Sequence, residues 1–250
     1  MRRAFTLVEL LCVVAVIGIL SALLIPAVTA AHQSAKRTHC LSNLKQMTTA
    51  SAIYSQEDPG GNFSDAIRDG DDNFNFLFPR QIGDSRVFLC PATHNIIRLG
   101  LYSTNHDTGA RQLEDLGDYA GNPSAPGTSY ELFGFMNNEP NSPNSTETQL
   151  GEKKISARGV RKSTQSIMAY QHQNEAFGLK GLIPSAGDFW LVTDGDGDQP
   201  PLHNNFPDPG NNHGNRGGNV GFCDGHAEWI GRDNYLRRYE LSQDENRSSP

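Results

Sequence analysis

The chain has 250 residues, of which 36% are hydrophobic and 20% charged, so it is long enough for one sizeable core. This composition excludes a mini-protein and a disordered acidic tail. The formal net charge of -7 excludes an overall basic field that would hold phosphate backbones, and we expect no nucleic-acid partner.

The first predicted element is a membrane helix over residues 5–31. Residues 10–31 contain no formally charged side chain. At 1.5 Å per residue, a helix over 5–31 would span about 40 Å, which exceeds the hydrocarbon core of about 30 Å. The apolar core of a secretory signal peptide is shorter, about 7–15 residues. Pro26 lies inside the segment and predicts a kink.

Glu9 is the unusual residue of this segment, because a carboxylate in the hydrocarbon region costs roughly 2.5–3.5 kcal/mol. One interpretation is that Glu9 lies near the helix end and reaches the headgroups. The surrounding residues, RRA followed by FTLVELL, resemble the leader of type IV prepilins and type II secretion pseudopilins. The resemblance implies that a prepilin peptidase cuts between Ala4 and Phe5 and methylates the new amine. It also implies that Glu9 is the assembly carboxylate, neutralised by the amine of a neighbouring subunit.

The helix is predicted to continue beyond the membrane over residues 32–57. Apolar residues recur there at spacings of three and four, as on one face of a helix, and the sequence DPGG from Asp58 ends it. The domain organisation that follows is a leader over 1–4, the membrane helix over 5–31 and its continuation over 32–57. A globular head over 58–241 and a polar tail over 242–250, which we expect to fray, complete the chain.

The head is predicted to be rich in short strands and long loops. Strand patterns occur at 86–90, 130–135, 166–170, 189–193, 219–223 and 226–230, separated by clusters of Gly, Pro and Asn. Three alternating aromatic residues, Phe74, Phe76 and Phe78, are expected to pack on the helix, with sugar binding as the alternative. With the leader resemblance, the fold class is α+β and pilin-like. A long N-terminal transmembrane helix packs on an antiparallel β-sheet head.

The C-terminal sequence NVGFCDGHAEWI predicts a hairpin. Asp224-Gly225 lies between two alternating runs and suits a two-residue turn with positive φ angles. The wider segment resembles the C-terminal signature of a bacterial group of prepilin-like proteins, a His followed by nine residues and Asp-Gly. Here ten residues separate His213 from Asp224. The same group shows a Cys and then Asn-Leu-Lys-Gln after the membrane helix, and a Cys-Pro in the head. This chain has CLSNLKQ from Cys40 and CP at Cys90.

A calcium loop is one interpretation of the run TDGDGDQP. Asp194, Asp196 and Asp198 are spaced two apart with glycines between them, so their carboxylates can converge on one hard cation. The twelfth-position glutamate of an EF-hand is missing. The alternative is a solvated acidic turn, in which case the chain has no cofactor.

Two interpretations also remain for the histidines and their neighbours. A transition-metal or hydrolytic site could use imidazole and thiolate groups, and a structural polar cluster could bridge the glycine loop to the hairpin. The residues concerned are His203, His213, Cys223, Asp224 and His226. The sequence contains no nucleophile elbow, zinc-protease helix or phosphate-binding loop, so we expect no enzyme and no catalytic residue.

The chain has four cysteines, and Cys12 falls in the membrane segment as a small packing residue. The remaining three form at most one intramolecular bridge in an oxidising compartment. A bridge between Cys40 and Cys90 would clip the helix to the head. The alternative is that both are free buried thiols.

Two functions follow from these expectations. The first is a pilin-like, pseudopilin subunit of a type II secretion or type IV pilus-like system, processed by prepilin peptidase. Its partners would be other pilin-like subunits and the inner membrane, which it crosses once, with the head in the periplasm or on the cell surface. It would have no small-molecule substrate. The alternative is a membrane-tethered extracytoplasmic module that binds calcium, a glycan or a peptide.

Overall fold

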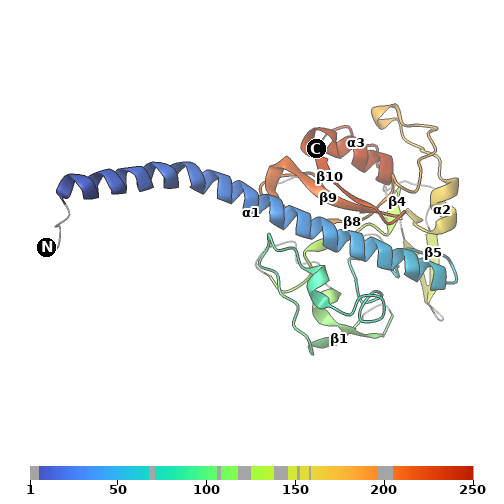
Figure 1. Cartoon of the computed structure of the whole chain (residues 1–250). Helices are drawn as coiled ribbons and strands as arrows, with labels where there is room; N and C mark the ends of the chain where they lie inside the picture. The colour runs from blue at the N-terminus through green and yellow to red at the C-terminus, as the bar shows by residue number, and fades with distance from the viewer. Residues whose placement is uncertain are drawn as a thin grey trace.

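The computed structural model describes residues 6–67, 71–105, 108–117, 125–137, 146–150, 153–157, 159–195 and 205–249. One long helix projects from a rounded head and continues across it (Figure 1). The head combines short helices with antiparallel strand pairs, so the predicted α+β, pilin-like architecture is confirmed.

Helix α1 (Leu7–Glu57) is one uninterrupted element of 51 residues that contains Pro26. Its N-cap is Thr6, and its C-cap is Asp58, whose carboxylate accepts hydrogen bonds from the backbone of Gly60 and Asn62, both 2.9 Å long. Among the described residues, α1 is the one helix long and apolar enough to cross a membrane, and its apolar window is not buried at all.

The second half of α1 lies on one face of a four-stranded antiparallel sheet with the order β10-β9-β8-β3. The strands are β3 (Tyr130–Leu132), β8 (Trp190–Asp194), β9 (Gly217–Phe222) and β10 (Ala227–Gly231). Helix α3 (Arg232–Gln243) packs on the other face, where Val220 and Phe222 of β9 contact the aromatic residues of α3. The sheet is therefore the middle layer between two helices.

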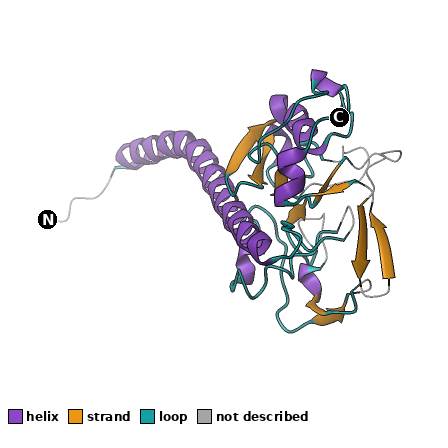
Figure 2. Ribbon diagram, turned by 90° about the vertical axis from the view of Figure 1, so that its right-hand side faces the viewer, coloured by secondary structure: helices purple, strands orange, loops and turns teal. Residues whose placement is uncertain are grey.

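The remaining elements connect and surround these layers (Figure 2). The strand pairs are β1 (Tyr102–Thr104) with β2 (Arg111–Leu113), β4 (Phe135–Met136) with β7 (Val160–Arg161), and β5 (Thr146–Leu150) with β6 (Lys153–Ala157). The short helices are η1 (Ser85–Phe88), η2 (Glu114–Leu116), α2 (Thr164–Ala169), η3 (Ala176–Gly178) and η4 (Gly214–Arg216). Phe76 packs edge-on against Tyr54 of α1, with ring centroids 4.9 Å apart.

Two of the predicted strands are helices instead. Residues 86–90 fall largely in η1, because the side chain of Asp84 accepts a hydrogen bond from the backbone N–H of Arg86 and caps the helix. Residues 166–170 fall largely in α2, which begins with a capping box between Ser163 and Ser166. In both places a side chain satisfies backbone N–H groups locally, and this outweighs the apolar alternation.

The prediction that the tail frays from residue 242 onward is also wrong for its first residues. Helix α3 continues to Gln243, and residues 242–244 are buried. The Asp244 carboxylate accepts hydrogen bonds from the Tyr170 hydroxyl at 2.5 Å and the Gln173 backbone N–H at 2.7 Å, and it lies 3.2 Å from Nδ1 of His172. The chain end is therefore anchored to the loop after α2.

The His172–Asp244 pair shifts both titrations. Burial acts to lower the pKa of His172, but the hydrogen bonds to Asp244 and to the Leu241 carbonyl outweigh it, and the pKa is raised. Burial acts to raise the pKa of Asp244, but the hydrogen bonds from His172, the Gln173 backbone and Tyr170 outweigh it, and the pKa is lowered.

A second feature of the fold is the close approach of α1 to β9. A Cβ atom at Gly221 would lie 2.4 Å from Cγ2 of Thr48, and 3.4 Å from the carbonyl oxygen of Leu44. The Thr48 hydroxyl also donates to the Leu44 carbonyl at 3.0 Å and to the Gly225 carbonyl at 3.3 Å. The helix can therefore lie this close to the sheet because position 221 has no side chain.

We predict that Gly221→Ala destabilises the head by about 1–3 kcal/mol, the usual cost of overpacking a tight contact. Thr48→Ser removes the clashing methyl group and keeps the hydroxyl, so the double variant should regain most of the loss. Urea unfolding of the full chain in detergent measures both effects. Gly231→Ala is the control, since an added Cβ there meets nothing within 4 Å. An equal loss in the Thr48→Ser background would contradict the packing argument.

We also predict that His172→Gln lowers stability at pH 6 by about 1.5–3 kcal/mol, the value of a hydrogen bond to a charged group. Because the folded pKa of His172 is raised from 6.5, its contribution is complete below pH 6.5 and is lost as the pH rises through the folded pKa. Because the pKa of Asp244 is lowered from its ordinary value of 3.8, the Asp244 carboxylate stays charged throughout the pH range of this test.

The measured quantity is the difference in melting temperature between wild type and variant at each pH. This difference is needed because burial raises the pKa values of Asp65 and Glu240 to about 7, and both groups titrate in both proteins. Melting curves between pH 5 and 9 should show the two proteins converging at high pH. His226→Gln, at a half-exposed imidazole, is the control. A constant difference across this range would show that the charge of His172 contributes nothing.

Candidate functional site

The N-terminal end of α1 forms a capping box. The Glu9 carboxylate accepts hydrogen bonds from the Thr6 backbone N–H at 2.9 Å and from the Thr6 hydroxyl at 2.7 Å. The Glu9 backbone N–H in turn donates to the Thr6 hydroxyl at 3.2 Å. The carboxylate therefore has partners within its own chain. Ala4 and Phe5 lie outside the described residues.

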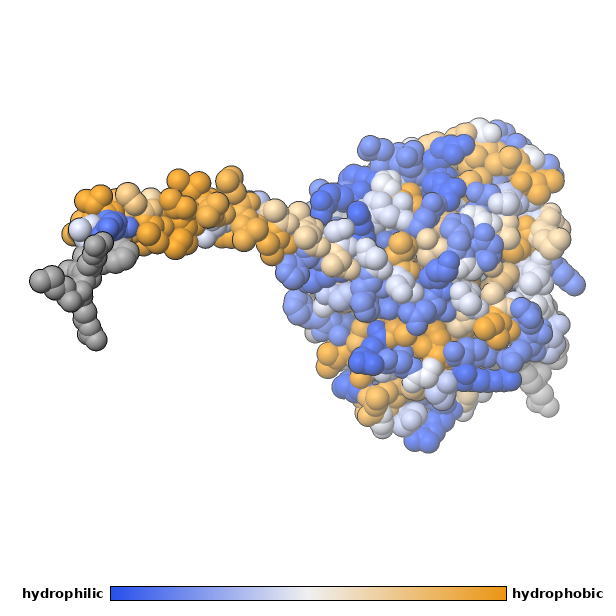
Figure 3. All heavy atoms as spheres, viewed as in Figure 1, coloured by the Kyte–Doolittle hydropathy of each residue, from blue (hydrophilic) through white to orange (hydrophobic). Residues whose placement is uncertain are grey.

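The surface of the projecting half of α1 is almost wholly apolar (Figure 3). Large hydrophobic side chains from Leu7 to Val28 are exposed, and most of them are more than half exposed. The visible face of the head is mainly hydrophilic by comparison (Figure 3). An apolar surface of this length needs a lipid or protein environment, because water disfavours it.

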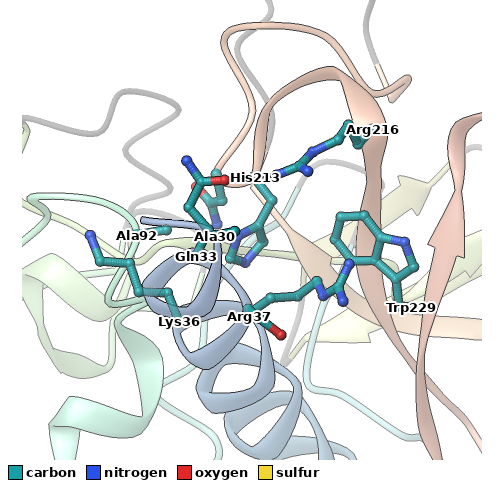
Figure 4. Close-up of a pocket in the computed structure, with 10 residues that line it drawn as sticks. Ala30, Gln33, Lys36, Arg37, Ala92, His213, Arg216 and Trp229 are labelled. Atoms are coloured by element: carbon teal, nitrogen blue, oxygen red, sulfur yellow. Dashed lines mark hydrogen bonds between the residues drawn. The ribbon is translucent and has the colours of Figure 1, made fainter. Parts of the chain in front are cut away.

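A cavity of about 330 Å³ lies where the projecting half of α1 meets the head (Figure 4). Its cationic side chains are Lys36 and Arg37 of α1 and Arg216 of η4. The Arg37 guanidinium lies 4.5 Å from the ring centroid of Trp229, and Arg216 donates to the side-chain oxygen of Gln33 at 2.9 Å. A head whose sequence is acidic thus presents a basic cavity beside the predicted membrane segment.

Behind this cavity, Cys40 of α1 is joined to Cys90 by a disulfide, with the two Cα atoms 5.2 Å apart. Both residues are buried. The bridge closes a sequence separation of 50 residues and clips the helix to the segment that follows η1. Of the two remaining cysteines, Cys12 is exposed on the apolar half of α1 and Cys223 is buried.

His213 and Asp194 lie beside this bridge. Nε2 of His213 is 3.6 Å from Sγ of Cys90 and 3.5 Å from Oδ2 of Asp194. Burial raises the pKa of Asp194, against the opposing influence of His213 and the backbone N–H of Asn219. Sequence reasoning missed this convergence, because the four residues come from separate segments and carry no common local pattern.

Among the described residues, the structure does not bring His213 together with Asp224 and His226. Asp194 is the last residue of β8 and is directed into the core, while Asp196, Asp198 and His203 lie outside the described residues. The calcium loop stays a prediction. His213 contacts Cys90 and Asp194, and no contact joins it to Asp224 among the described residues.

The hairpin turn differs from the predicted two-residue type. The Gly225 N–H donates to the Phe222 carbonyl at 3.0 Å, and the Phe222 N–H donates to the His226 carbonyl at 2.9 Å. Three residues, 223–225, therefore form the loop, and of these only Gly225 has a positive φ, +88°. Such a loop is a type I turn followed by a left-handed residue.

Side chains at the turn make local contacts. Asp224 accepts hydrogen bonds from the His226 backbone N–H at 3.0 Å and lies 2.5 Å from its Nδ1. The His226 ring stacks on Phe222, with centroids 4.1 Å apart. Burial raises the pKa of the Cys223 thiol to about 12, so it stays protonated at neutral pH. These contacts define a structural turn.

Comparison with known proteins gives a family match and a similar curated protein. The prokaryotic N-terminal methylation motif matches residues 1–25. The type IV major pilin protein PilA of Myxococcus xanthus (strain DK1622) is 39% identical over 67 residues, which are 26% of this chain. The chain covers 30% of the length of that relative. No solved structure matches.

The methylation motif, the pilin relative and the long apolar helix agree with one another. The start of the chain is thus similar to that of type IV prepilins, as the leader sequence predicted.

We predict that Gly225→Val destabilises the head by about 1–3 kcal/mol, the cost of holding a β-branched residue in the left-handed region. The space around Gly225 is open, with the nearest atom 4.0 Å from an added Cβ, so the cost is conformational. Gly83→Val, in open space without a positive φ, is the control for thermal unfolding of the full chain. Equal melting temperatures for the two variants would refute the turn assignment.

Proposed function

We propose that the chain is a structural subunit of a pilus-like assembly, anchored in the inner membrane and processed between Ala4 and Phe5 by a prepilin peptidase. The observation that carries this proposal is the prepilin motif at the start of a helix with an uncovered apolar half. Helix bundling with copies of the chain or with related subunits would cover that surface. The head lies outside the cytoplasm, and its role is structural rather than catalytic.

The Thr6–Glu9 capping box supports a two-stage role for the carboxylate. In the single chain, Thr6 satisfies Glu9 through two hydrogen bonds, which reduces the cost of inserting it among apolar groups. Cleavage before Phe5 creates a cationic amine, and an amine of a neighbouring subunit can replace Thr6 as the stronger partner. Assembly then gains a charge pair that the monomer lacks.

A second candidate is a tethered ligand-binding module. The basic cavity beside α1 favours it, because cationic groups and an indole ring surround a space of about 330 Å³. Such a module needs the anchor and the cavity but does not need filament formation. It would therefore remain with the membrane when filaments are sheared away.

The test is the fate of Glu9 variants in a host with a prepilin peptidase. We predict that Glu9→Leu and Glu9→Gln both stay in the membrane and fall at least about tenfold in the sheared filament fraction, since neither can pair with an amine. Glu9→Gln is the matched variant, because glutamine still completes a capping box. Mass spectrometry of the intact protein should show loss of residues 1–4 and gain of a methyl group.

Three results would count against the proposal. Filaments formed by Glu9→Gln at wild-type levels would assign Glu9 to helix capping alone. A processed wild-type chain that never enters the sheared fraction would favour the tethered module. Retention of residues 1–4 in the membrane-bound protein would contradict processing.

A further inference from the structure

The cluster around the disulfide contains the donor set of a metal site. Four ligand atoms, one each from Cys40, Cys90, Asp194 and His213, all lie within 4.8 Å of one another. They come from α1, the segment after η1, the end of β8 and the residue before η4. Two sulfurs, one imidazole and one carboxylate form a ligand set that suits Zn²⁺.

The distances agree with a tetrahedral centre. With bonds of 2.0–2.3 Å to zinc, neighbouring nitrogen, oxygen and sulfur ligands lie about 3.3–3.6 Å apart. Nε2 of His213 is 3.6 Å from Sγ of Cys90 and 3.5 Å from Oδ2 of Asp194. The same nitrogen lies near both atoms, so one ion between them could be bound by all three. The sulfurs are bonded to each other, and rotation about the Cα–Cβ bonds would separate them once that bond is broken.

The interior of the cluster also has a polar group that the fold leaves unsatisfied. Asp194 is 4% exposed, and its Oδ1 accepts no hydrogen bond of ordinary geometry from the described residues, although the side chains of Asn212 and Asn219 lie close enough to act against the raised pKa of Asp194. Its Oδ2 accepts from the backbone N–H of Asn219 at 2.7 Å. A buried carboxylate with one unpartnered oxygen is costly in a core, and a cation beside it removes that cost.

An ion can reach the cluster from solvent. His213 lines the cavity shown in Figure 4, together with Ala92, which follows Cys90 closely in the chain. The His213 side chain is 7% exposed, whereas both cysteines are almost fully buried. The imidazole is therefore the group that an entering ion meets first.

We propose that the chain with Cys40 and Cys90 in the thiol form binds one Zn²⁺ through Cys40, Cys90, Asp194 and His213. Disulfide and zinc are then two exclusive states of one site. A dithiol reductant passes two electrons and two protons to the disulfide and becomes a disulfide itself. Zinc binding displaces the two thiol protons, and a disulfide oxidant reverses the change with release of the ion. In both states a covalent or coordinate link holds α1 against the head.

The test uses the full chain in detergent, reduced with a phosphine, desalted without oxygen and mixed with Zn²⁺ alone. We expect one zinc per chain in the reduced protein and less than about a tenth of that in the oxidised protein. Co²⁺ in place of zinc should give the visible absorption of a tetrahedral thiolate site. Competition with a chromophoric chelator measures the affinity.

The variants distinguish this site from adventitious thiol binding. Cys40→Ser should abolish zinc binding, and His213→Gln and Asp194→Asn should each weaken it at least about tenfold. Cys223→Ser and His226→Gln, at a thiol and an imidazole outside the cluster, are the matched controls and should bind as wild type does. Circular dichroism of each variant, under the conditions of the binding measurement, checks that it is folded.

Two results would overturn the proposal. One is a reduced wild-type chain that binds zinc no better than Cys40→Ser. The other is unchanged affinity in folded His213→Gln and Asp194→Asn, which would assign the metal to the two thiols alone. The test does not measure filament formation, so its result is independent of the proposed assembly role.

Discussion

The fold depends on one helix, α1, whose first half is apolar and uncovered by the chain and whose second half packs on the head. The first half of α1 presents an almost wholly apolar surface, and the second half lies flat on the sheet. That second contact is set by Gly221, because Thr48 occupies the space that a side chain at 221 would need. The head covers α1 only from about Cys40 onward, so the apolar half cannot be buried by its own chain. A membrane or neighbouring helices must supply the rest.

The strong periodic elements could be predicted from the sequence, and the short ones could not. The helix over 5–57 and the strands around 190, 220 and 228 follow from long apolar runs and from the Asp-Gly turn. The segments at 86–90 and 166–170 look like strands by their alternation, but capping by Asp84 and Ser163 makes them helical. A capping side chain stabilises a helix by about 1 kcal/mol, which is enough to decide between helix and strand in a short segment. The pattern of apolar residues contains no information about this contribution.

At the chain end, the sequence prediction failed for a different reason: polar residues were expected to be exposed, but they are buried. Residues from Ser242 onward are polar, yet Gln243 and Asp244 are buried because distant residues of the loop after α2 satisfy them. Likewise, the aspartate spacing at 194–198 suggested a loop that faces solvent, whereas Asp194 is directed toward His213. Long-range partners decide the burial of a polar residue, and no local window contains them.

The spacing between His213 and Asp224 has a physical explanation in this fold. His213 and Asp224 are separated mainly by β9, which at about 3.3 Å per residue holds its two ends roughly 20 Å apart. They therefore cannot share a site. His213 packs at one end against Cys90 and Asp194, and at the other end the turn receives a hydrogen bond from Thr48.

The strand between these ends runs along α1. Asn219 donates to the carbonyl oxygen of Arg37 at 3.4 Å, and Gly225 accepts from Thr48 eleven residues further along the helix. A change in the number of residues between the histidine and the turn would shift one end of β9 relative to α1. In this chain the spacing of ten residues therefore matches the length of helix along which β9 runs, and Cys40 lies within that length as the residue where the helix is covalently held.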